Sequence, residues 1–187
     1  MRCTRSGGPD SDVTLDLRDA RAGDALLEHV GRTHGRLDGV VVAAGIVAFG
    51  DLIDTDDVVI EELFLTNAMG PMWLAKRVAP ALQESQGFFV NLSGVVAETP
   101  MPGMAAYSAS KAAAAAATEA IRREFRRMKI AVIDVRPPHT ETGLATRPLA
   151  GTAPKMPVGL DPSVVAERVV TAIEQGDAAV GSADFSA

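Results

Sequence analysis

The stretch Val40-Val41-Val42-Ala43-Ala44-Gly45 is the segment that decides the fold. Its first four residues form a continuous apolar run of mostly β-branched side chains, which is typical of a strand buried on both faces. Two further segments that are rich in apolar residues, Phe88-Phe89-Val90-Asn91-Leu92 and residues 129–135, are also interpreted as buried strands. Strands of this type occur mainly in parallel sheets that helices cover on both sides. The three runs therefore predict an α/β fold with a mostly parallel sheet.

Helical segments separate these runs, as the connections of a parallel sheet require. Residues 19–34 precede the first run and carry apolar side chains on one side. Residues 55–84 and 105–128 fill the intervals between the runs, and we expect the first of these helices to bend at Gly70-Pro71, where a backbone hydrogen bond is lost. A last helix over residues 161–175 completes the alternation of strand and helix.

The composition fits a single globular domain over residues 1–187, because this length suffices for one hydrophobic core. The net charge of -6 gives no support to nucleic-acid binding, and no apolar run is long enough to span a membrane. Cys3 is the one cysteine, so no internal disulfide is possible, and we predict a cytoplasmic protein. The histidines, His29, His34 and His139, lack metal-ligand spacing, so we predict no metal.

The single tyrosine of the chain, Tyr107, is followed four residues later by Lys111. Positions four apart share one face of a helix, so the phenol and the ammonium can approach each other at the start of the helix over residues 105–128. A nearby cation favours the phenolate and lowers a tyrosine pKa that is ordinarily about 10. A tyrosine of lowered pKa can donate or accept a proton near neutral pH.

Two other polar residues lie near this pair in the predicted fold. Ser93 follows the strand over residues 88–92, and open α/β sheets bind ligands at the carboxyl ends of their strands. Asn67 lies inside the helix over residues 55–84, although asparagine is a poor helix former. A surface position or a local kink is the plainer interpretation of this asparagine.

Three motifs together resemble those of the short-chain dehydrogenase/reductase family. They are Tyr107-Ser108-Ala109-Ser110-Lys111, Asn91-Leu92-Ser93-Gly94 and Leu65-Thr66-Asn67-Ala68-Met69-Gly70, in the order and at the separations of the family's Asn-Ser-Tyr-Lys set. The resemblance covers nearly all of the chain. It implies a Rossmann-like, doubly wound fold and an oxidoreductase that interconverts a carbonyl and an alcohol of a small molecule by hydride transfer with NAD(P).

The resemblance also implies residue roles. Tyr107 would exchange a proton with the substrate oxygen, and Ser93 would hydrogen-bond that oxygen. Lys111 would lower the tyrosine pKa and hold the nicotinamide ribose, while Asn67 would hold a water that links Lys111 to solvent. The other residues that the resemblance places at the cofactor, besides Tyr107 and Lys111, are Arg5, Asp16, Leu17, Ala44, Gly45, Pro137, Thr140 and Thr142.

Some of these cofactor contacts have a specific partner in the family. Asp16 would contact the adenine, and Thr142, together with Thr140, would hold the nicotinamide carboxamide. Arg5 stands where an arginine pairs with the 2′-phosphate of NADP, which favours NADP(H) over NAD(H). A terminal arginine without such a role is the plainer interpretation of Arg5.

One part of the family pattern is missing, namely the glycine-rich turn that binds the pyrophosphate. Gly7-Gly8 has neither a strand before it nor a helix after it. We therefore expect an N-terminally truncated member that lacks the first strand–helix–strand unit. In such a chain Val13-Thr14-Leu15-Asp16-Leu17 has no sheet neighbour, and residues 40–43 form an exposed edge.

Residues 137–161 stand at the position of the family's substrate loop. The Ala-rich helix over residues 105–128 resembles the family's dimer-forming helix, so we expect a homodimer or homotetramer through this helix and residues 55–84. The alternative to an enzyme is a short homologue that has lost dinucleotide binding and acts as an interaction or scaffold protein. A different α/β binding module would require the motif set to be coincidence.

Overall fold

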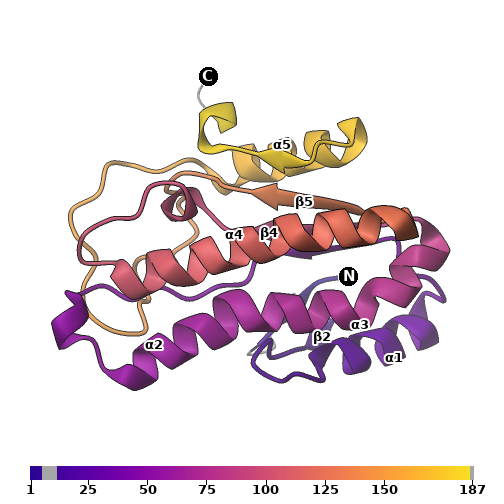
Figure 1. Ribbon diagram of the computed structural model, residues 1–187, viewed down its shortest axis with the longest axis horizontal. Coiled ribbons are helices and arrows are strands. Elements are labelled where there is room, and N and C mark those ends of the chain that lie inside the picture. Colours follow the sequence, from indigo (N-terminus) through magenta and orange to yellow (C-terminus); the bar gives the residue numbers. More distant parts are fainter. Residues whose placement is uncertain (6–11, 186–187) are drawn as a thin grey trace.

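A four-stranded parallel sheet forms the centre of the computed structural model, which describes residues 1–5 and 12–185 (Figure 1). The strands, in their order across the sheet, are β3 (Gly39–Val42), β4 (Phe88–Leu92), β5 (Ala131–Val135) and β6 (Ala179–Val180). All three pairings are parallel, with Val41 beside Val90 and Val90 beside Ile133. The predicted α/β fold with a mostly parallel sheet is confirmed.

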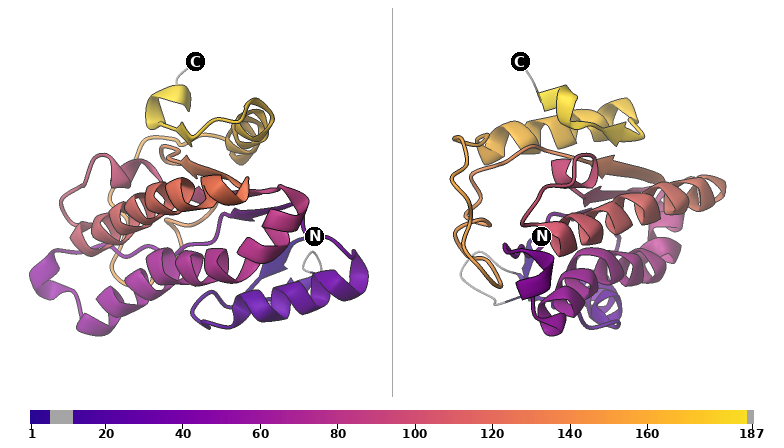
Figure 2. Two further views of the ribbon diagram at one scale, coloured as in Figure 1. Left: turned by 45° about the vertical axis from the view of Figure 1, so that its right-hand side comes forward. Right: turned by 60° about the vertical axis from the view of Figure 1, so that its left-hand side comes forward.

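Helices cover both faces of this sheet, as a doubly wound fold requires. The five α-helices are α1 (Ala22–Thr33), α2 (Asp57–Phe64), α3 (Gly70–Ser85), α4 (Ala105–Phe125) and α5 (Pro162–Gln175). Figures 1 and 2 show α3 and α4 on one side of the sheet, with α1 beside α3, and α5 on the other side.

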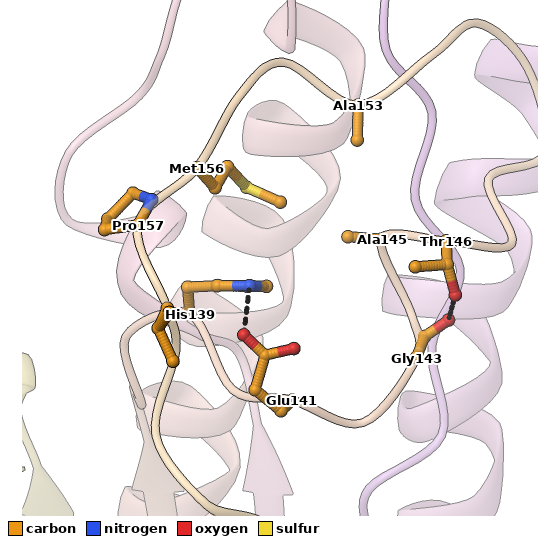
Figure 3. Close-up of a pocket in the computed structure, with 9 residues that line it drawn as sticks. His139, Glu141, Gly143, Ala145, Thr146, Ala153, Met156 and Pro157 are labelled. Carbon is orange, nitrogen blue, oxygen red and sulfur yellow. Dashed lines mark hydrogen bonds and ion pairs between the residues drawn. The ribbon is translucent and has the colours of Figure 1, made fainter.

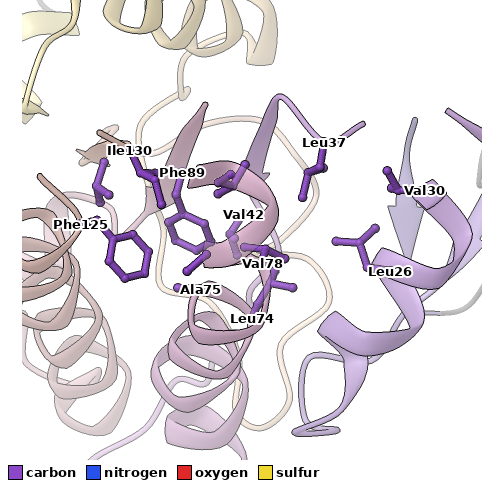
Figure 4. Packing of buried hydrophobic residues seen from close by; sticks show 13 residues of the cluster. Leu26, Val30, Leu37, Val42, Leu74, Ala75, Val78, Phe89, Phe125 and Ile130 are labelled. Atoms are coloured by element: carbon purple, nitrogen blue, oxygen red, sulfur yellow. The ribbon is translucent and has the colours of Figure 1, made fainter. Parts of the chain in front are cut away.

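The alternation of side chains along β4 divides the core between the two faces. Phe89 points toward α3 and α4, where it belongs to a buried cluster with Val78 and Phe125 (Figure 4). The next residue, Val90, points the opposite way and packs in the cluster that includes Val169 of α5. Both strand residues are almost fully buried, so β4 is the strand that ties the two layers together.

The ends of α5 show how the sequence sets helix boundaries. Asp161 caps the N-terminus, since its carboxylate accepts a hydrogen bond from the Ser163 backbone N–H at 2.8 Å, and Pro162 occupies the first helical position. Gly176 ends the helix in the left-handed conformation with φ of 70°. These signals explain why α5 lies so close to the predicted range 161–175.

The N-terminal strands lie outside the main sheet. β1 (Cys3–Thr4) and β2 (Val13–Thr14) pair in parallel as a separate two-stranded sheet. The expectation that residues 13–17 have no sheet neighbour is therefore wrong, because the chain before them supplies one. The exposed edge is confirmed: β3 ends the main sheet, and Val41 is 47% exposed. Its exposure also means that this strand is not buried on both faces.

The helix predicted over residues 55–84 is interrupted just before Gly70-Pro71. There α2 continues through a π-helical segment, Leu65–Met69, directly into α3. Pro71 lies in the first turn of α3, where its ring is accommodated. The irregularity therefore falls on the residues around Asn67, which a wider i to i+5 hydrogen-bonding pattern displaces from the regular helical course.

Residues 137–160 cross the carboxyl end of the sheet as a long loop, visible in Figure 2 as the light orange segment beside the sheet. A single bridge between Thr140 and Leu160 closes the base of this loop. Two backbone hydrogen bonds, from Leu149 to Val47 and from Phe49 to Ala150, fasten its middle to the segment that follows β3. Over residues 1–5 and 12–185, no helix is both long and apolar enough to cross a bilayer.

Candidate active site

Tyr107 and Lys111 lie one turn apart at the start of α4, where the chain returns from the carboxyl end of β4. Tyr107 is 8% exposed and packs in a cluster with Val47 and Leu63. Lys111 is 6% exposed, and its Nζ donates a hydrogen bond to the Leu92 carbonyl oxygen at 2.9 Å. The pair that the sequence predicted on one helix face is therefore present, with its ammonium fixed against the end of β4.

Burial moves the pKa values of both groups toward their neutral forms. Burial raises the pKa of Tyr107 to about 12. Burial lowers the pKa of Lys111 to about 8, and the negative charge of Asp134 partly opposes this effect. The prediction that Lys111 lowers the tyrosine pKa is wrong for this arrangement, since desolvation of the phenol dominates and the ammonium is turned to Leu92.

Asn67 sits within the π-helical segment and is 2% exposed. Its Oδ1 accepts a hydrogen bond from the Ile46 N–H, and its Nδ2 donates to the Ile46 carbonyl and to Ser110 Oγ, at 2.9 to 3.0 Å. This asparagine is therefore neither a surface residue nor a simple kink. It joins the segment after β3 to α4 and uses both amide hydrogens to do so.

Gly45 completes the group around Lys111. A Cβ atom on Gly45 would lie 3.3 Å from Lys111 Nζ and 3.2 Å from Asn67 Oδ1. These separations are tighter than ordinary van der Waals contact, so the absence of a side chain lets the chain pass close to the ammonium. Asn67, Gly45 and Lys111 are thus brought together, with Tyr107 one turn before Lys111 on α4, whereas Ala44 is exposed to solvent.

Ser93 is placed differently from its predicted role. Its side chain is fully buried, and its hydroxyl donates to Asp134 Oδ1 at 2.6 Å. A hydroxyl has one proton to donate, so this hydroxyl has none left for a substrate carbonyl. The second oxygen of Asp134 accepts from Arg136 Nε at 2.6 Å. Sequence reasoning missed Asp134, although a carboxylate inside the apolar run 129–135 is a signal that could have identified it.

The residues predicted for the adenosine end lie near one another at the ends of β1 and β2. Asp16 forms an ion pair with Arg18 at 2.6 Å, and Arg18 also reaches Glu62 at 3.0 Å. The hydrogen bond from Arg18 holds the pKa of the Asp16 carboxyl below its usual range, and the charge of Arg5 adds to this effect. Leu17 packs so tightly on α3 that a Cβ atom on Gly70 would lie 2.6 Å from its carbonyl oxygen.

The loop residues predicted to contact nicotinamide form mostly local contacts. The Pro137 carbonyl accepts from the Val95 N–H at 3.0 Å, and Thr140 Oγ1 donates to the Pro138 carbonyl at 2.9 Å. Thr142 is exposed. These residues therefore line the path of the chain from β5 into the loop, with the hydroxyl of Thr140 already engaged.

A cavity of about 240 Å³ lies within the same loop (Figure 3). His139 Nε2 and Glu141 Oε1 lie 3.3 Å apart at its wall, and Glu141 Oε1 also accepts from the Gly159 N–H. Ala145 and Ala153 line the cavity and also pack against the cluster that contains Tyr107. The cavity therefore adjoins the tyrosine side of the site.

The residues fit one end of a nicotinamide dinucleotide better than the other. Lys111 and Tyr107, with Gly45 beside them, form a polar group at the carboxyl end of a parallel sheet, where such cofactors bind. Within the described ranges, no strand passes through a turn with the three glycines of a phosphate-binding motif into a helix. Nor do three His, Cys, Asp or Glu side chains of these ranges gather as metal ligands do.

Comparison with known proteins agrees with this description. Residues 4–151 match the family model of short chain dehydrogenases. A dehydrogenase/reductase SDR family member 7B from Xenopus tropicalis is 30% identical over 169 residues, which are 86% of this chain and 55% of the relative. The short-chain dehydrogenase ptmH from Penicillium ochrochloron is 32% identical over 124 residues, 66% of this chain and 45% of that protein. The chain spans about half the length of the curated relatives it matches.

Solved structures show the same fold. A short chain dehydrogenase from Burkholderia cenocepacia in complex with NADP superposes with a TM-score of 0.81 at 23% identity, over 96% of this chain and 74% of that one. A 3-ketoacyl-(acyl-carrier-protein) reductase from Brucella melitensis complexed with NADH gives a TM-score of 0.80 at 20% identity, over 94% and 77%. The sheet and its covering helices are therefore a Rossmann-like α/β arrangement.

Proposed function

We propose that this chain, which belongs to the short-chain dehydrogenase family, is an oxidoreductase that interconverts a carbonyl and an alcohol of a small molecule with NAD(P), and that Tyr107 exchanges the proton. The observation that carries this proposal is the fixed group of Tyr107, Lys111, Asn67 and Gly45 at the carboxyl end of the sheet. A family match alone would not supply that placement.

In reduction of a carbonyl, Tyr107 would donate its proton to the oxygen that gains negative charge. Burial raises the pKa of Tyr107 to about 12, so the phenol is protonated at physiological pH, as it would be at its ordinary pKa of about 10. When bound, the cofactor supplies or removes the hydride. Lys111 would bind the ribose hydroxyls through its remaining N–H donors, and Asn67 would orient a water beside it.

The remaining cofactor contacts are those that the family resemblance implies. Asp16 and Leu17 would hold the adenine, Ala44 and Gly45 would pass beneath the ribose, and the loop residues Pro137, Thr140 and Thr142 would hold the nicotinamide carboxamide. Arg5 would pair with the 2′-phosphate of the cofactor, which would favour NADP(H). The neighbours are complexed with NADP in one case and NADH in another, so the comparison of both cofactors belongs in the test.

The loop over residues 137–161 is the proposed substrate loop. Its cavity of about 240 Å³ suits a small ligand, and its walls combine Met156 and Pro157 with the polar pair His139 and Glu141. A moderately apolar carbonyl compound with one hydrogen-bonding group matches this lining.

The second candidate function is that of an interaction or scaffold protein. Two observations favour it: the described residues contain no strand–turn–helix with the phosphate-binding glycines, and the edge of β3 is exposed at Val41. Exposed strand edges can pair with another chain. Exposed apolar residues on α2 and α3, Val58 and Met72, support in addition a homodimer or homotetramer through residues 55–84 and 105–128, which sedimentation velocity tests directly.

Titration of the full chain with NADPH and NADH, followed by calorimetry, distinguishes the two functions. The enzyme requires saturable binding and oxidation of NADPH by a panel of small aldehydes and ketones. Tyr107→Phe should lower that rate at least about 100-fold while the dissociation constant for NADPH stays within about twofold. Unchanged turnover in the variant refutes the role of Tyr107, and a chain that binds neither cofactor favours the scaffold function.

A further inference from the structure

Asp134 is a buried carboxylate in the middle of an apolar strand. It is 3% exposed, and its strand neighbours Ile133 and Val135 are fully buried. A carboxylate in such surroundings is costly unless hydrogen bonds and an opposite charge compensate for the lost water. Ser93 donates to one oxygen at 2.6 Å, and Arg136 donates to the other at the same distance. The fold therefore maintains this charge with dedicated partners.

The carboxylate and the Lys111 ammonium act on the same end of β4. Asp134 lies beside Asn91 in the sheet register, and Ser93 follows two residues later. Lys111 donates to the carbonyl of Leu92, the residue directly before Ser93. The ammonium and the carboxylate are thus attached to consecutive residues of one strand end, within range of electrostatic interaction.

Other groups around Lys111 carry no charge that replaces this one. From the segment after β3 the neighbour is Gly45, from the π-helical segment it is Asn67, and Tyr107 on the preceding turn stays a neutral phenol. Asp134 is the charged residue, within the described part of the chain, whose field acts on the ammonium. An opposite charge favours the protonated form of a buried lysine.

We propose that Asp134 is a positioning residue, which holds the Lys111 ammonium charged against the end of β4, and that Ser93 positions the Asp134 carboxylate instead of contacting a substrate. Only the relevance to turnover rests on the proposed function of Lys111. The electrostatic link itself is argued from the placement of both side chains at one strand end, where Lys111 is bound to Leu92 and Asp134 to Ser93.

Arg136 limits the strength of this link, because it shares the same carboxylate. It also reaches Glu98 at 3.2 Å, and Glu98 accepts a hydrogen bond from Ser182 at 2.6 Å. The chain of contacts therefore runs from Lys111 through Asp134 to the segment Ser182–Phe185 near the C-terminus. Removing Arg136 should leave more of the Asp134 charge to act on Lys111.

The chain contains four lysines, Lys76, Lys111, Lys129 and Lys155, so their side chains can be followed individually by NMR after labelling with ¹³C-lysine. Asp134→Asn keeps the shape and removes the charge. It should lower the pH at which Lys111 titrates by about one unit. Glu124→Gln removes one charge from an exposed position of the same helix and should leave that pH unchanged. A folded Asp134→Asn protein in which Lys111 titrates as in the wild type overturns the proposal.

Two further variants keep the test decisive if Asp134→Asn does not fold. Arg136→Gln should shift the Lys111 titration in the opposite direction, upward by several tenths of a unit, and the absence of any shift would refute the link. Ser93→Ala should change the Lys111 titration in the wild-type background but not in the Asp134→Asn background. If Ser93 instead contacts the substrate, Ser93→Ala lowers kcat and leaves the Lys111 titration unchanged.

None of these titrations requires cofactor or turnover. If the wild-type protein has no oxidoreductase activity but Asp134→Asn still shifts the Lys111 titration, only the proposed function is refuted. If the wild-type protein is active but Asp134→Asn leaves the Lys111 titration unchanged, only the positioning role of Asp134 is refuted. The pH profile of kcat tests the proposed function and the positioning role together, since in Asp134→Asn this profile should shift by the same amount as the Lys111 titration.

Discussion

The two ends of the proposed cofactor site are built in contrasting ways. Around the carboxyl end of β4, Asn67, Ser93, Lys111 and Asp134 are at most 6% exposed, and hydrogen bonds join their side chains to neighbouring elements of the fold. At the ends of β1 and β2, Asp16 keeps a third of its side chain exposed and is held by surface ion pairs. The region at the end of β4 is therefore held by buried hydrogen bonds, whereas the region at the ends of β1 and β2 is held by partly exposed ion pairs.

The two kinds of contact differ in how much movement of the side chains they allow. A buried polar group with all partners in place tolerates little movement, because each lost hydrogen bond leaves an unpaired group without water. An exposed ion pair costs little to rearrange. The group around Lys111 is therefore held by hydrogen bonds that are costly to break, whereas the ion pairs around Asp16 can rearrange at little cost.

The largest expected contrast is in stability. Leu82→Ala, at a fully buried position of α3, should lower the free energy of unfolding by about 4 kcal/mol. Leu15→Ala, next to β2 and only partly packed on the same core, should lower it by about 1 kcal/mol. Urea unfolding followed by circular dichroism measures both. Equal losses would show that the N-terminal strands are as integral to the core as α3.

The second contrast concerns charge burial at Lys111. Its folded pKa of about 8 lies below the usual value of 10.5, so the unfolded chain binds this proton more tightly and stability rises with pH between these values. The free energy of unfolding should increase by about 2 kcal/mol from about pH 7.5 to about pH 10 relative to Lys111→Met. Parallel pH curves for the two proteins would contradict the burial of the ammonium.

The third test uses the one tyrosine of the chain. With a pKa of about 12, the Tyr107 phenol should show little phenolate absorbance in the folded protein at about pH 10.5. The urea-unfolded chain, titrated in parallel, should be more than half ionised there. The Tyr107→Phe variant gives the absorbance that comes from Trp73, which is subtracted from that of the wild type. Coinciding titrations of folded and unfolded chains would show that the phenol is hydrated, or that a cation offsets its burial.

The smallest expected effect lies at the exposed end. Arg18→Gln removes both ion pairs of Arg18, yet it should lower the free energy of unfolding by less than about 1 kcal/mol. High salt should reduce the effect further, since these charges face solvent. A loss above about 2 kcal/mol would mean that this region is held as firmly as the sheet.

Much of the fold follows from local sequence patterns. The apolar run 88–92 gives β4 with its predicted bounds, and the cap at Asp161 with Gly176 defines α5. The motifs that carry the family resemblance led to Asn67, Tyr107 and Lys111, which the fold brings together. These features depend on neighbours in the sequence, and such neighbours are visible without a structure.

The remaining features depend on contacts between distant segments. Ser93 donates to Asp134, which lies 41 residues away, and no local pattern indicates which of several nearby acceptors a hydroxyl will choose. The raised pKa of Tyr107 results from packing against residues of other elements, such as Val47. The pairing of β1 with β2 likewise joins two short segments, and nothing in the sequence of residues 13–17 indicates which strand lies beside them.

The π-helical segment Leu65–Met69 has a consequence for how the chain tolerates changes of length. Each helical residue turns the chain by about 100° and advances it by about 1.5 Å. Deleting a single residue from regular α2 would rotate α3 by that angle and carry the row Leu74, Val78 and Leu82 away from β4. The same deletion within the π-helical segment would cost far less, because the segment can return to the regular i to i+4 pattern and keep that row facing the sheet. The extra residue around Asn67 thus sets the rotation of α3, which packs in the core, relative to α2 and the segment that carries Asn67.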